Sequence, residues 1–191
     1  MTPIHTAVRN GITIELSLGD ITHQDDVQAV VNAANAELMP GGGVAGAIHR
    51  AAGPELAEAC KPLAPLRPGD AVMTDAFRMP NQKIIHCLGP VYGQDQPAAD
   101  LLALCYQAAL ALADKNGLES IAFPALSTGA FGYPLAEAAE VALGAVVGMA
   151  DQLTRVRLIR FVLFDEAARD LHGQTLSRLA EQGFATSLGE G

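Results

Sequence analysis

The sequence predicts an α/β fold, a three-layer α/β/α sandwich with a mixed central sheet. Apolar runs of strand length alternate along the chain with Ala- and Leu-rich stretches of helix length. Such alternation is typical of a sheet that helices cover on both faces. Half of the residues are hydrophobic, which is enough for a sizeable core. The 191 residues contain no linker, so we expect one domain over 1–191 with a core of about 12–182.

The amino-terminal third of the chain predicts two strands and two helices. Apolar and polar residues alternate over 12–18, which is the period of a half-buried strand. The short apolar run AVVN at 29–32 predicts a second strand. Helices are expected over 44–52 and 54–61, because Gly53 breaks the run and proline suits the first helical turn that follows.

The middle of the chain predicts an antiparallel pair of strands, so we expect the sheet to be mixed. The runs 71–76 and 83–89 predict strands joined by a turn at 79–82, and neighbours this close can pair antiparallel. After them, helix-length stretches again alternate with strands. The remaining expected elements are a helix at 98–116, a strand at 120–123, a helix at 134–150, a strand at 158–164, a helix at 166–182 and a frayed tail at 186–191.

Composition excludes several classes of function. Twelve basic and 21 acidic residues give a net charge of −9, which repels polyanions and argues against broad nucleic-acid binding. The three cysteines show no CxxC spacing and the five histidines no HExxH pair, so no metal site is expected. A reducing cytoplasm suits free cysteines. No apolar run is long enough to span a membrane, and the amino terminus does not resemble a signal peptide.

Two glycine-rich loops lie where a predicted strand gives way to a helix. The first is NAANAELMPGGGVAG at 32–46 and the second is PALSTGAFGYP at 124–134. Backbone N–H groups at such positions favour anions, and glycine lets the backbone approach a ligand closely. Ser127 and Thr128 add hydroxyl groups to the second loop. The pair predicts a diphosphate site, although either loop alone is better explained as an ordinary tight turn.

The first loop also raises a rival function. Gly41, Gly43 and Gly46 satisfy the letters GxGxxG of a nicotinamide-dinucleotide site. That fingerprint should follow its strand directly, whereas eight residues separate Asn32 from Gly41. An NAD-dependent oxidoreductase is therefore kept as a minor alternative.

Five motifs in order resemble the macrodomain family. They are GDIT at 19–22, VVNAAN at 30–35, GGGVxGAIHRAAG at 41–53, IIHCLGPVY at 84–92 and FPALSTGAFGYP at 123–134. Their spacing is similar to that of the MacroD-type branch. The resemblance implies a ligand, ADP-ribose, without a further cofactor. It also implies removal of mono-ADP-ribose from acidic side chains or of acetyl from O-acetyl-ADP-ribose.

The resemblance assigns an adenine end to the site. Asp20 would accept a hydrogen bond from the adenine amine, with the backbone of Ile21 beside it. Phe164, at the end of the last predicted strand, would lie against the adenine face. From the residues alone, Asp20 is also explained as a turn or helix-cap aspartate and Phe164 as a core residue.

The resemblance also assigns the diphosphate and the distal ribose. Asn35 would hydrogen-bond the distal ribose and serve catalysis, whereas Asn32 is expected to hold its own loop. His49 could face the site, but a helix histidine satisfied by a neighbour is the better explanation. The Phe131 ring would border the distal ribose. The segments expected to enclose the ligand comprise Gly41, Gly42, Gly43, Val44, Ser127, Thr128, Gly129, Ala130 and Phe131.

The chain departs from the family pattern at one position. Active MacroD-type enzymes carry Asp in GGGVDG, where it activates or orients the attacking water, and here that residue is Ala45. Loss of a well-placed base costs roughly 10²-fold to 10⁴-fold in rate, about 3 to 5 kcal/mol. The chain could be an engineered trap of an active hydrolase, a natural reader, or an enzyme that relies on a ligand phosphate. The otherwise complete motif set favours the trap.

The sequence therefore predicts a cytoplasmic, monomeric macrodomain of the hydrolase branch, impaired by Ala45. Its expected partners are ADP-ribose, mono-ADP-ribosylated proteins and O-acetyl-ADP-ribose. The second hypothesis is a non-catalytic reader of ADP-ribosylated proteins, and the third is the NAD-dependent oxidoreductase.

Overall fold

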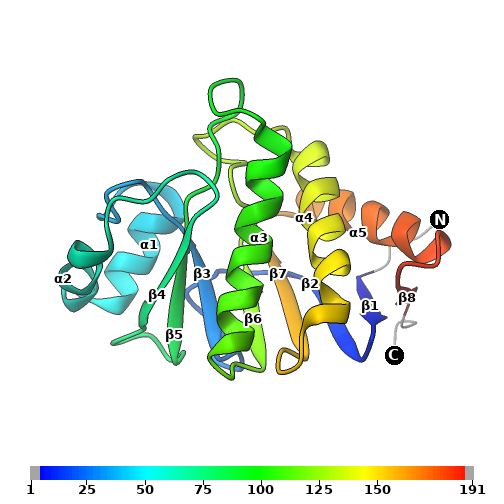
Figure 1. Cartoon of the computed structure of the whole chain (residues 1–191), viewed down its shortest axis with the longest axis horizontal. Helices are drawn as coiled ribbons and strands as arrows, with labels where there is room; N and C mark the ends of the chain where they lie inside the picture. The colour runs from blue at the N-terminus through cyan, green and yellow to red at the C-terminus, as the bar shows by residue number, and fades with distance from the viewer. Residues whose placement is uncertain (1–4, 188–191) are drawn as a thin grey trace.

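A computed structural model describes residues 5–187, and they form a mixed eight-stranded sheet with helices on both faces (Figure 1). The sheet confirms the predicted fold class. Its strands are β1 Thr6–Arg9, β2 Ile12–Leu18, β3 Ala29–Ala33, β4 Ala71–Asp75, β5 Lys83–Cys87, β6 Ser120–Phe123, β7 Leu158–Leu163 and β8 Thr186–Ser187.

The strand order is β4-β5-β3-β6-β7-β2-β1-β8. The five central strands, from β5 to β2, are all parallel. Antiparallel strands complete both edges, and the predicted pairing of β4 with β5 is confirmed. Buried parallel strands such as β3 have near-continuous apolar sequences because helices cover both of their faces.

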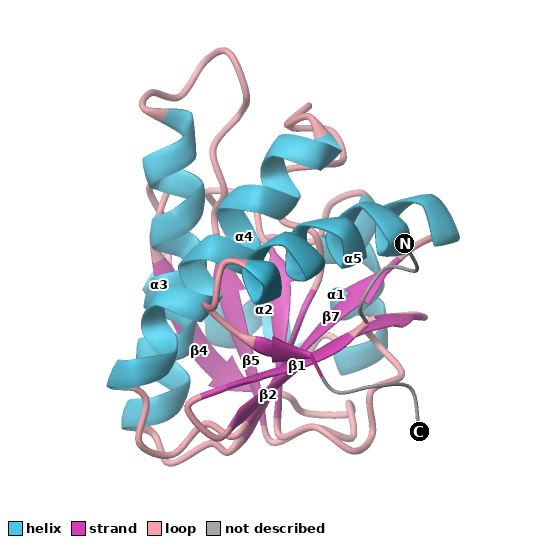
Figure 2. Cartoon of the chain, turned by 90° about the vertical axis from the view of Figure 1, so that its right-hand side faces the viewer, coloured by secondary structure: helices cyan, strands magenta, loops and turns pink. Residues whose placement is uncertain are grey.

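Residues 5–187 contain five α-helices, which cover the sheet in two layers. Each layer of helices packs on the sheet through its own hydrophobic cluster. One cluster joins α3, α4 and α5 to one face of the sheet, and the other joins α1 and α2 to the opposite face. In Figure 2, α3 and α1 lie on opposite sides of the strands. The helices are α1 Gly43–Ala52, α2 Glu55–Cys60, α3 Ala98–Lys115, α4 Leu135–Met149 and α5 Glu166–Glu181, with short 3₁₀ turns at Lys61–Leu63 and Ala150–Gln152. Among residues 5–187, none of the helices is both long and apolar enough to cross a membrane.

The last two strands on one side of the sheet, β1 and the edge strand β8, differ from the sequence expectation. β1 lies before the expected start of the core and pairs with β2, and β8 pairs with β1. The predicted fraying of 186–191 is therefore wrong for Thr186 and Ser187, while 188–191 lie outside the described residues. The other elements lie within a residue or two of their predicted bounds.

The carboxyl ends of the parallel strands share one edge of the sheet. The loop after β3 leads into α1, the loop after β6 leads into α4, and a short turn joins β7 to α5. Ligands of open α/β sheets bind at this edge. Both glycine-rich loops lie there.

Candidate functional site

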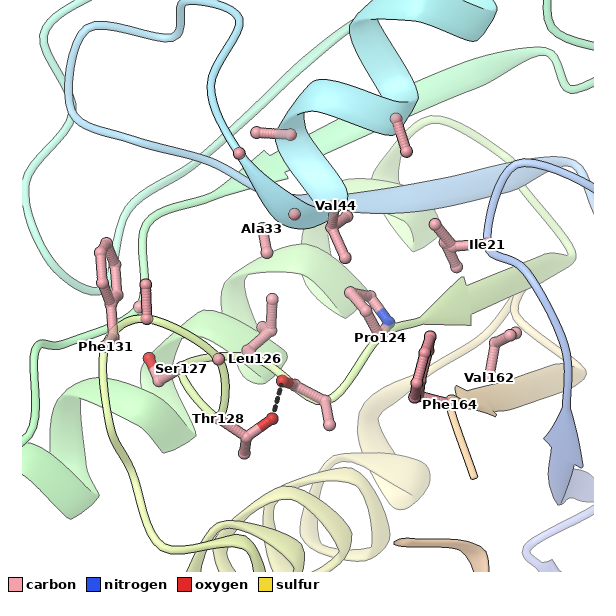
Figure 3. Close-up of a pocket in the computed structure, with 18 of the residues that line it drawn as sticks. Ile21, Ala33, Val44, Pro124, Leu126, Ser127, Thr128, Phe131, Val162 and Phe164 are labelled. Atoms are coloured by element: carbon pink, nitrogen blue, oxygen red, sulfur yellow. Dashed lines mark hydrogen bonds between the residues drawn. The ribbon is translucent and has the colours of Figure 1, made fainter. Parts of the chain in front are cut away.

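A cavity of about 910 Å³ opens at the carboxyl ends of the parallel strands (Figure 3). It brings together segments that follow β2, β3, β6 and β7. Every residue selected from the sequence lines it: Asp20, Ile21, Asn35, Gly41, Gly42, Gly43, Val44, Ala45, Ser127, Thr128, Gly129, Ala130, Phe131 and Phe164. Phe164 and Phe131 lie toward opposite ends in Figure 3, so the cavity is elongated.

The first glycine loop opens the amino terminus of α1 to this cavity. Gly42 occupies the helix cap position without a capping side chain, and Gly43 has a φ of 56°, a conformation that favours glycine. A Cβ atom at Gly42 or Gly43 would meet no protein atom within 4 Å. At Gly46, in contrast, a Cβ would clash with the carbonyl oxygen of Gly41. Packing thus explains Gly46, whereas Gly42 and Gly43 leave uncapped N–H groups open to an anion.

The second glycine loop holds Ser127 in a strained conformation. Ser127 has a φ of 66° and is 7% exposed, and its hydroxyl has no partner among residues 5–187. A Cβ at the neighbouring Gly89 would clash with that hydroxyl, so Gly89 makes room for it. A buried, unpartnered hydroxyl on the wall of a cavity is suited to bind a ligand.

Thr128 differs from its neighbour, because its hydroxyl donates to the carbonyl oxygen of Ala125 at 2.7 Å (Figure 3). The loop therefore uses the Thr128 proton to hold its own shape. Of the two loop hydroxyls, that of Ser127 is therefore the one placed to donate to a ligand in this conformation.

Asp20 forms the turn after β2 and still faces the cavity. One of its carboxylate oxygens accepts hydrogen bonds from the backbone N–H and hydroxyl of Thr22, at 2.8 and 2.7 Å. These bonds are the main reason that the pKa of Asp20 is lowered, so the carboxylate is ionised at neutral pH. The side chain remains 57% exposed. The turn role and the ligand role are thus compatible.

Arg160 supports the Asp20 turn and was not selected from the sequence. Its guanidinium donates to Gln24 Oε1 at 2.9 Å, and Gln24 Nε2 donates to the Asp20 carbonyl at 2.9 Å. Arg160 also pairs with Glu15 and, through two bonds of 2.7 Å, with Asp26. The role of Arg160 could not be predicted from its place in the strand β7, because its acidic partners lie more than 130 residues away in the sequence.

Phe164 is 95% exposed, so the alternative that it packs in the core is wrong. It follows β7, and in Figure 3 its ring lies near Ile21, Pro124 and Val162 at one end of the cavity. An exposed aromatic face beside a cavity is suited to stack on a planar ligand group.

Asn35, and not Asn32, holds the first glycine loop. Asn35 closes its own loop, because Nδ2 donates to the Met39 carbonyl at 2.8 Å and Oδ1 accepts from Met39 N–H at 3.0 Å. Asn32 is buried within β3, and its Nδ2 lies 3.0 Å from Nδ1 of His86 on β5. The prediction that Asn32 holds the loop is wrong. Asn32 still belongs to β3, and its side chain contacts His86 on the neighbouring strand instead of the loop.

His49 neither lines the cavity nor finds a partner. It is 6% exposed, and both ring nitrogens lack a hydrogen-bond partner among the described residues. Both sequence explanations of His49 are therefore wrong. Burial lowers the pKa of His49, and burial together with His49 lowers the pKa of His86 to about 3. Both imidazoles are neutral at physiological pH.

Among residues 5–187, neither α1 nor the loop before it contributes an acidic side chain to the cavity lining. Ala45 lies in the first turn of α1 and is 5% exposed. Asp20 and Asp165 are the acidic residues of the lining, and both lie on the β2 and β7 side. Asp165 caps α5 by accepting from Ala168 N–H at 2.8 Å. In the part of the chain that the structure describes, no group of three or more His, Cys, Asp or Glu is placed to hold a metal ion.

Comparison with known proteins defines the family. A model described as Macro domain matches residues 31–142. A protein of Salmonella gallinarum named O-acetyl-ADP-ribose deacetylase is 46% identical over 173 residues, 86% of this chain and 94% of its own length. A macro domain-containing protein of Mesorhizobium japonicum is 44% identical over 167 residues, 87% of this chain and 94% of its own length. This chain belongs to the macro domain family, which confirms the resemblance.

Solved structures agree with this assignment. An Oceanobacillus iheyensis macrodomain with ADP superimposes with a TM-score of 0.88 at 40% identity, covering 93% of this chain and 96% of its own. A Trypanosoma brucei macrodomain in complex with ADP-ribose gives a TM-score of 0.79 at 36% identity, covering 85% of this chain and 68% of its own.

Proposed function

We propose that the cavity binds ADP-ribose, with adenine at the Phe164 end and the distal ribose at the Phe131 end. The observation that carries the proposal is the meeting of both glycine loops in one cavity of a chain with a net charge of −9. Such a surface repels anions in general, so a diphosphate needs local donors. The uncapped start of α1 and the unpartnered hydroxyl of Ser127 supply them.

The dimensions of the cavity suit this ligand. Its volume of about 910 Å³ lies within the range of about 300–1,000 Å³ that is typical of small-molecule sites. Phe164 offers an aromatic face, and the ionised carboxylate of Asp20 can accept a hydrogen bond from the adenine amine but repels the carbonyl oxygen that guanine presents there. The Oceanobacillus and Trypanosoma structures each carry an adenine nucleotide, ADP or ADP-ribose.

We further propose that the chain is a member of the hydrolase branch whose base is missing. Relatives at 46% identity are named O-acetyl-ADP-ribose deacetylase. The methyl group of Ala45 cannot accept a proton, and α1 has no acidic residue in its first turn. Since carboxylates are favoured at helix amino termini, Ala45→Asp fits this position electrostatically. It would place a base beside the distal ribose.

The alternative is a reader of ADP-ribosylated proteins, and the same methyl group favours it. Calorimetric titration with ADP-ribose and with NAD tests binding: ADP-ribose should bind at one site and more tightly than NAD. Tighter binding of NAD would instead favour the oxidoreductase. Hydrolysis of a mono-ADP-ribosylated acceptor and of O-acetyl-ADP-ribose then separates hydrolase from reader.

Ala45→Asp should raise the hydrolysis rate by at least about tenfold, because a positioned base contributes roughly 10²-fold to 10⁴-fold. No gain, in protein that binds ADP-ribose, would overturn the hydrolase proposal and leave the reader. We also propose a monomer in the cytoplasm, where the three free, buried cysteines stay reduced. Sedimentation of the purified chain tests the monomer.

A further inference from the structure

A second hollow of about 460 Å³ lies beside the ADP-ribose cavity. We name it the tyrosine hollow, after Tyr92 and Tyr133, which line it with Gln96, Pro97, Ala98 and Glu137. It forms where the loop after β5 meets the starts of α3 and α4, whose amino-terminal ends lie side by side at the top of Figure 1. The two cavities share no lining residue.

The tyrosine hollow adjoins the end of the main cavity that holds Phe131. Tyr92 N–H donates to the Phe131 carbonyl at 2.9 Å, and Tyr133 follows Phe131 by two residues. On α4, Leu135 lines the main cavity and Glu137 lines the hollow. If the distal ribose lies at Phe131, whatever is attached to that ribose leaves the cavity beside the hollow.

The lining has the chemistry of a cation site. The rings of Tyr92 and Tyr133 lie 4.9 Å apart at 55°, and the hydroxyl of Tyr92 donates to the Glu137 carboxylate at 3.3 Å. Tyr92 is 43% exposed, so part of its ring is accessible. Aromatic faces and a carboxylate together attract an ammonium or guanidinium group. Burial and the charge of Glu137 raise the pKa of Tyr133, as expected where the local potential is negative.

Basic residues are scarce in the part of the sequence that lines the tyrosine hollow. The segment 84–154 provides the whole lining and contains seven acidic residues but one basic residue, Lys115. Lys115 ends α3, while Ala98 at the other end of that helix lines the hollow. At 1.5 Å per residue, the two positions are about 25 Å apart. None of the ion pairs among residues 5–187 includes Glu137, so its carboxylate is available to a cation of another molecule.

We propose that the tyrosine hollow binds a lysine or arginine side chain of the polypeptide that carries ADP-ribose. The inference rests on the proposed ADP-ribose binding and extends it to the protein part of the substrate. The protein would then prefer some ADP-ribosylated polypeptides over others. A polypeptide with a basic residue near the modified position would make contacts in the hollow that free ADP-ribose cannot make.

The test uses ADP-ribosylated peptides in which glutamine replaces the acceptor glutamate, so that the linkage resists hydrolysis. Pairs of peptides carry either lysine or its neutral isostere norleucine at one position within four residues of the acceptor. Calorimetric titration should show lysine peptides binding about fivefold more tightly at one or more of these positions. This preference should weaken in high salt.

Two variants test the hollow itself. Glu137→Gln and Tyr92→Leu should bring lysine and norleucine peptides to equal affinity while leaving the affinity for free ADP-ribose unchanged. Glu140→Gln is the matched control, because it removes the same charge one turn further along α4, where Glu140 pairs with Arg178 at 2.7 Å. It should keep the preference for lysine.

The outcomes separate this inference from the one it rests on. If both peptides bind with equal affinity at every position, the tyrosine hollow does not bind a basic side chain. The same conclusion follows if Glu137→Gln and Glu140→Gln change the preference for lysine equally. Neither result affects the proposed binding of ADP-ribose. Failure of free ADP-ribose to bind the unaltered chain overturns the proposed function, and this inference with it.

Discussion

Replacement of Phe164 by alanine should separate ligand binding from stability. The ring is 95% exposed, so it contributes little to the folded state. Exposed substitutions change the free energy of unfolding by no more than about 0.5 kcal/mol. Stacking of one base on an aromatic ring contributes about 1–3 kcal/mol. Phe164→Ala should therefore weaken ADP-ribose binding by about 5-fold to 150-fold and leave the unfolding midpoint almost unchanged.

Titration calorimetry with ADP-ribose and urea unfolding measure the two quantities on the same protein. Phe184→Ala provides the control, because Phe184 is 50% exposed and does not line the cavity. It should change neither affinity nor, beyond a small loss, stability. Unchanged affinity in Phe164→Ala would refute adenine stacking at this end of the cavity. A loss of stability above about 2 kcal/mol would show that the ring packs against the fold.

Further predictions concern the glycine loop, the buried histidine and the strained serine. Gly42→Ala should weaken ADP-ribose binding without lowering thermal stability, whereas Gly46→Ala should lower thermal stability because its Cβ clashes with the Gly41 carbonyl. The pKa of His86 falls from 6.5 to about 3 on folding, so the unfolded chain binds the extra proton. The contribution of His86 to the free energy of unfolding should then be fully present above pH 6.5 and fall by about 3 kcal/mol between pH 7 and pH 4. His86→Gln should reduce this pH dependence in urea unfolding. Ser127→Ala should weaken ADP-ribose binding in calorimetry with little change in the unfolding midpoint, since its hydroxyl has no partner among residues 5–187; a clear loss of stability would reveal one.

Much of the fold could be predicted because its elements carry local patterns. The alternation over Ile12–Leu18 and the apolar run of β3 are enough to identify both segments as strands. Two short strands were not predicted: β1 has four residues, β8 at the sheet edge has two, and each is defined by its pairing. The strand order, with β3 between β5 and β6, arises from contacts that no local pattern records.

The candidate site, too, could be predicted only where a local sequence pattern marks its residues. Residues in glycine loops at strand ends could be placed together because parallel strands share an edge. No sequence pattern indicates that Arg160 supports the Asp20 turn, or that Asn32 meets His86, since each pairing depends on register between distant segments. The tyrosine hollow was missed for this reason too, as its residues come from two loops and two helices.

A crystal structure of the chain with ADP-ribose tests the central claim most directly. We expect the diphosphate between the Gly42–Val44 backbone and the loop at 127–130, with adenine against Phe164. The distal ribose should lie between Phe131 and Ala45, opening toward Tyr92. A nucleotide bound in the opposite direction, or outside this cavity, would contradict the proposed binding mode and remove the basis for the role given to position 45.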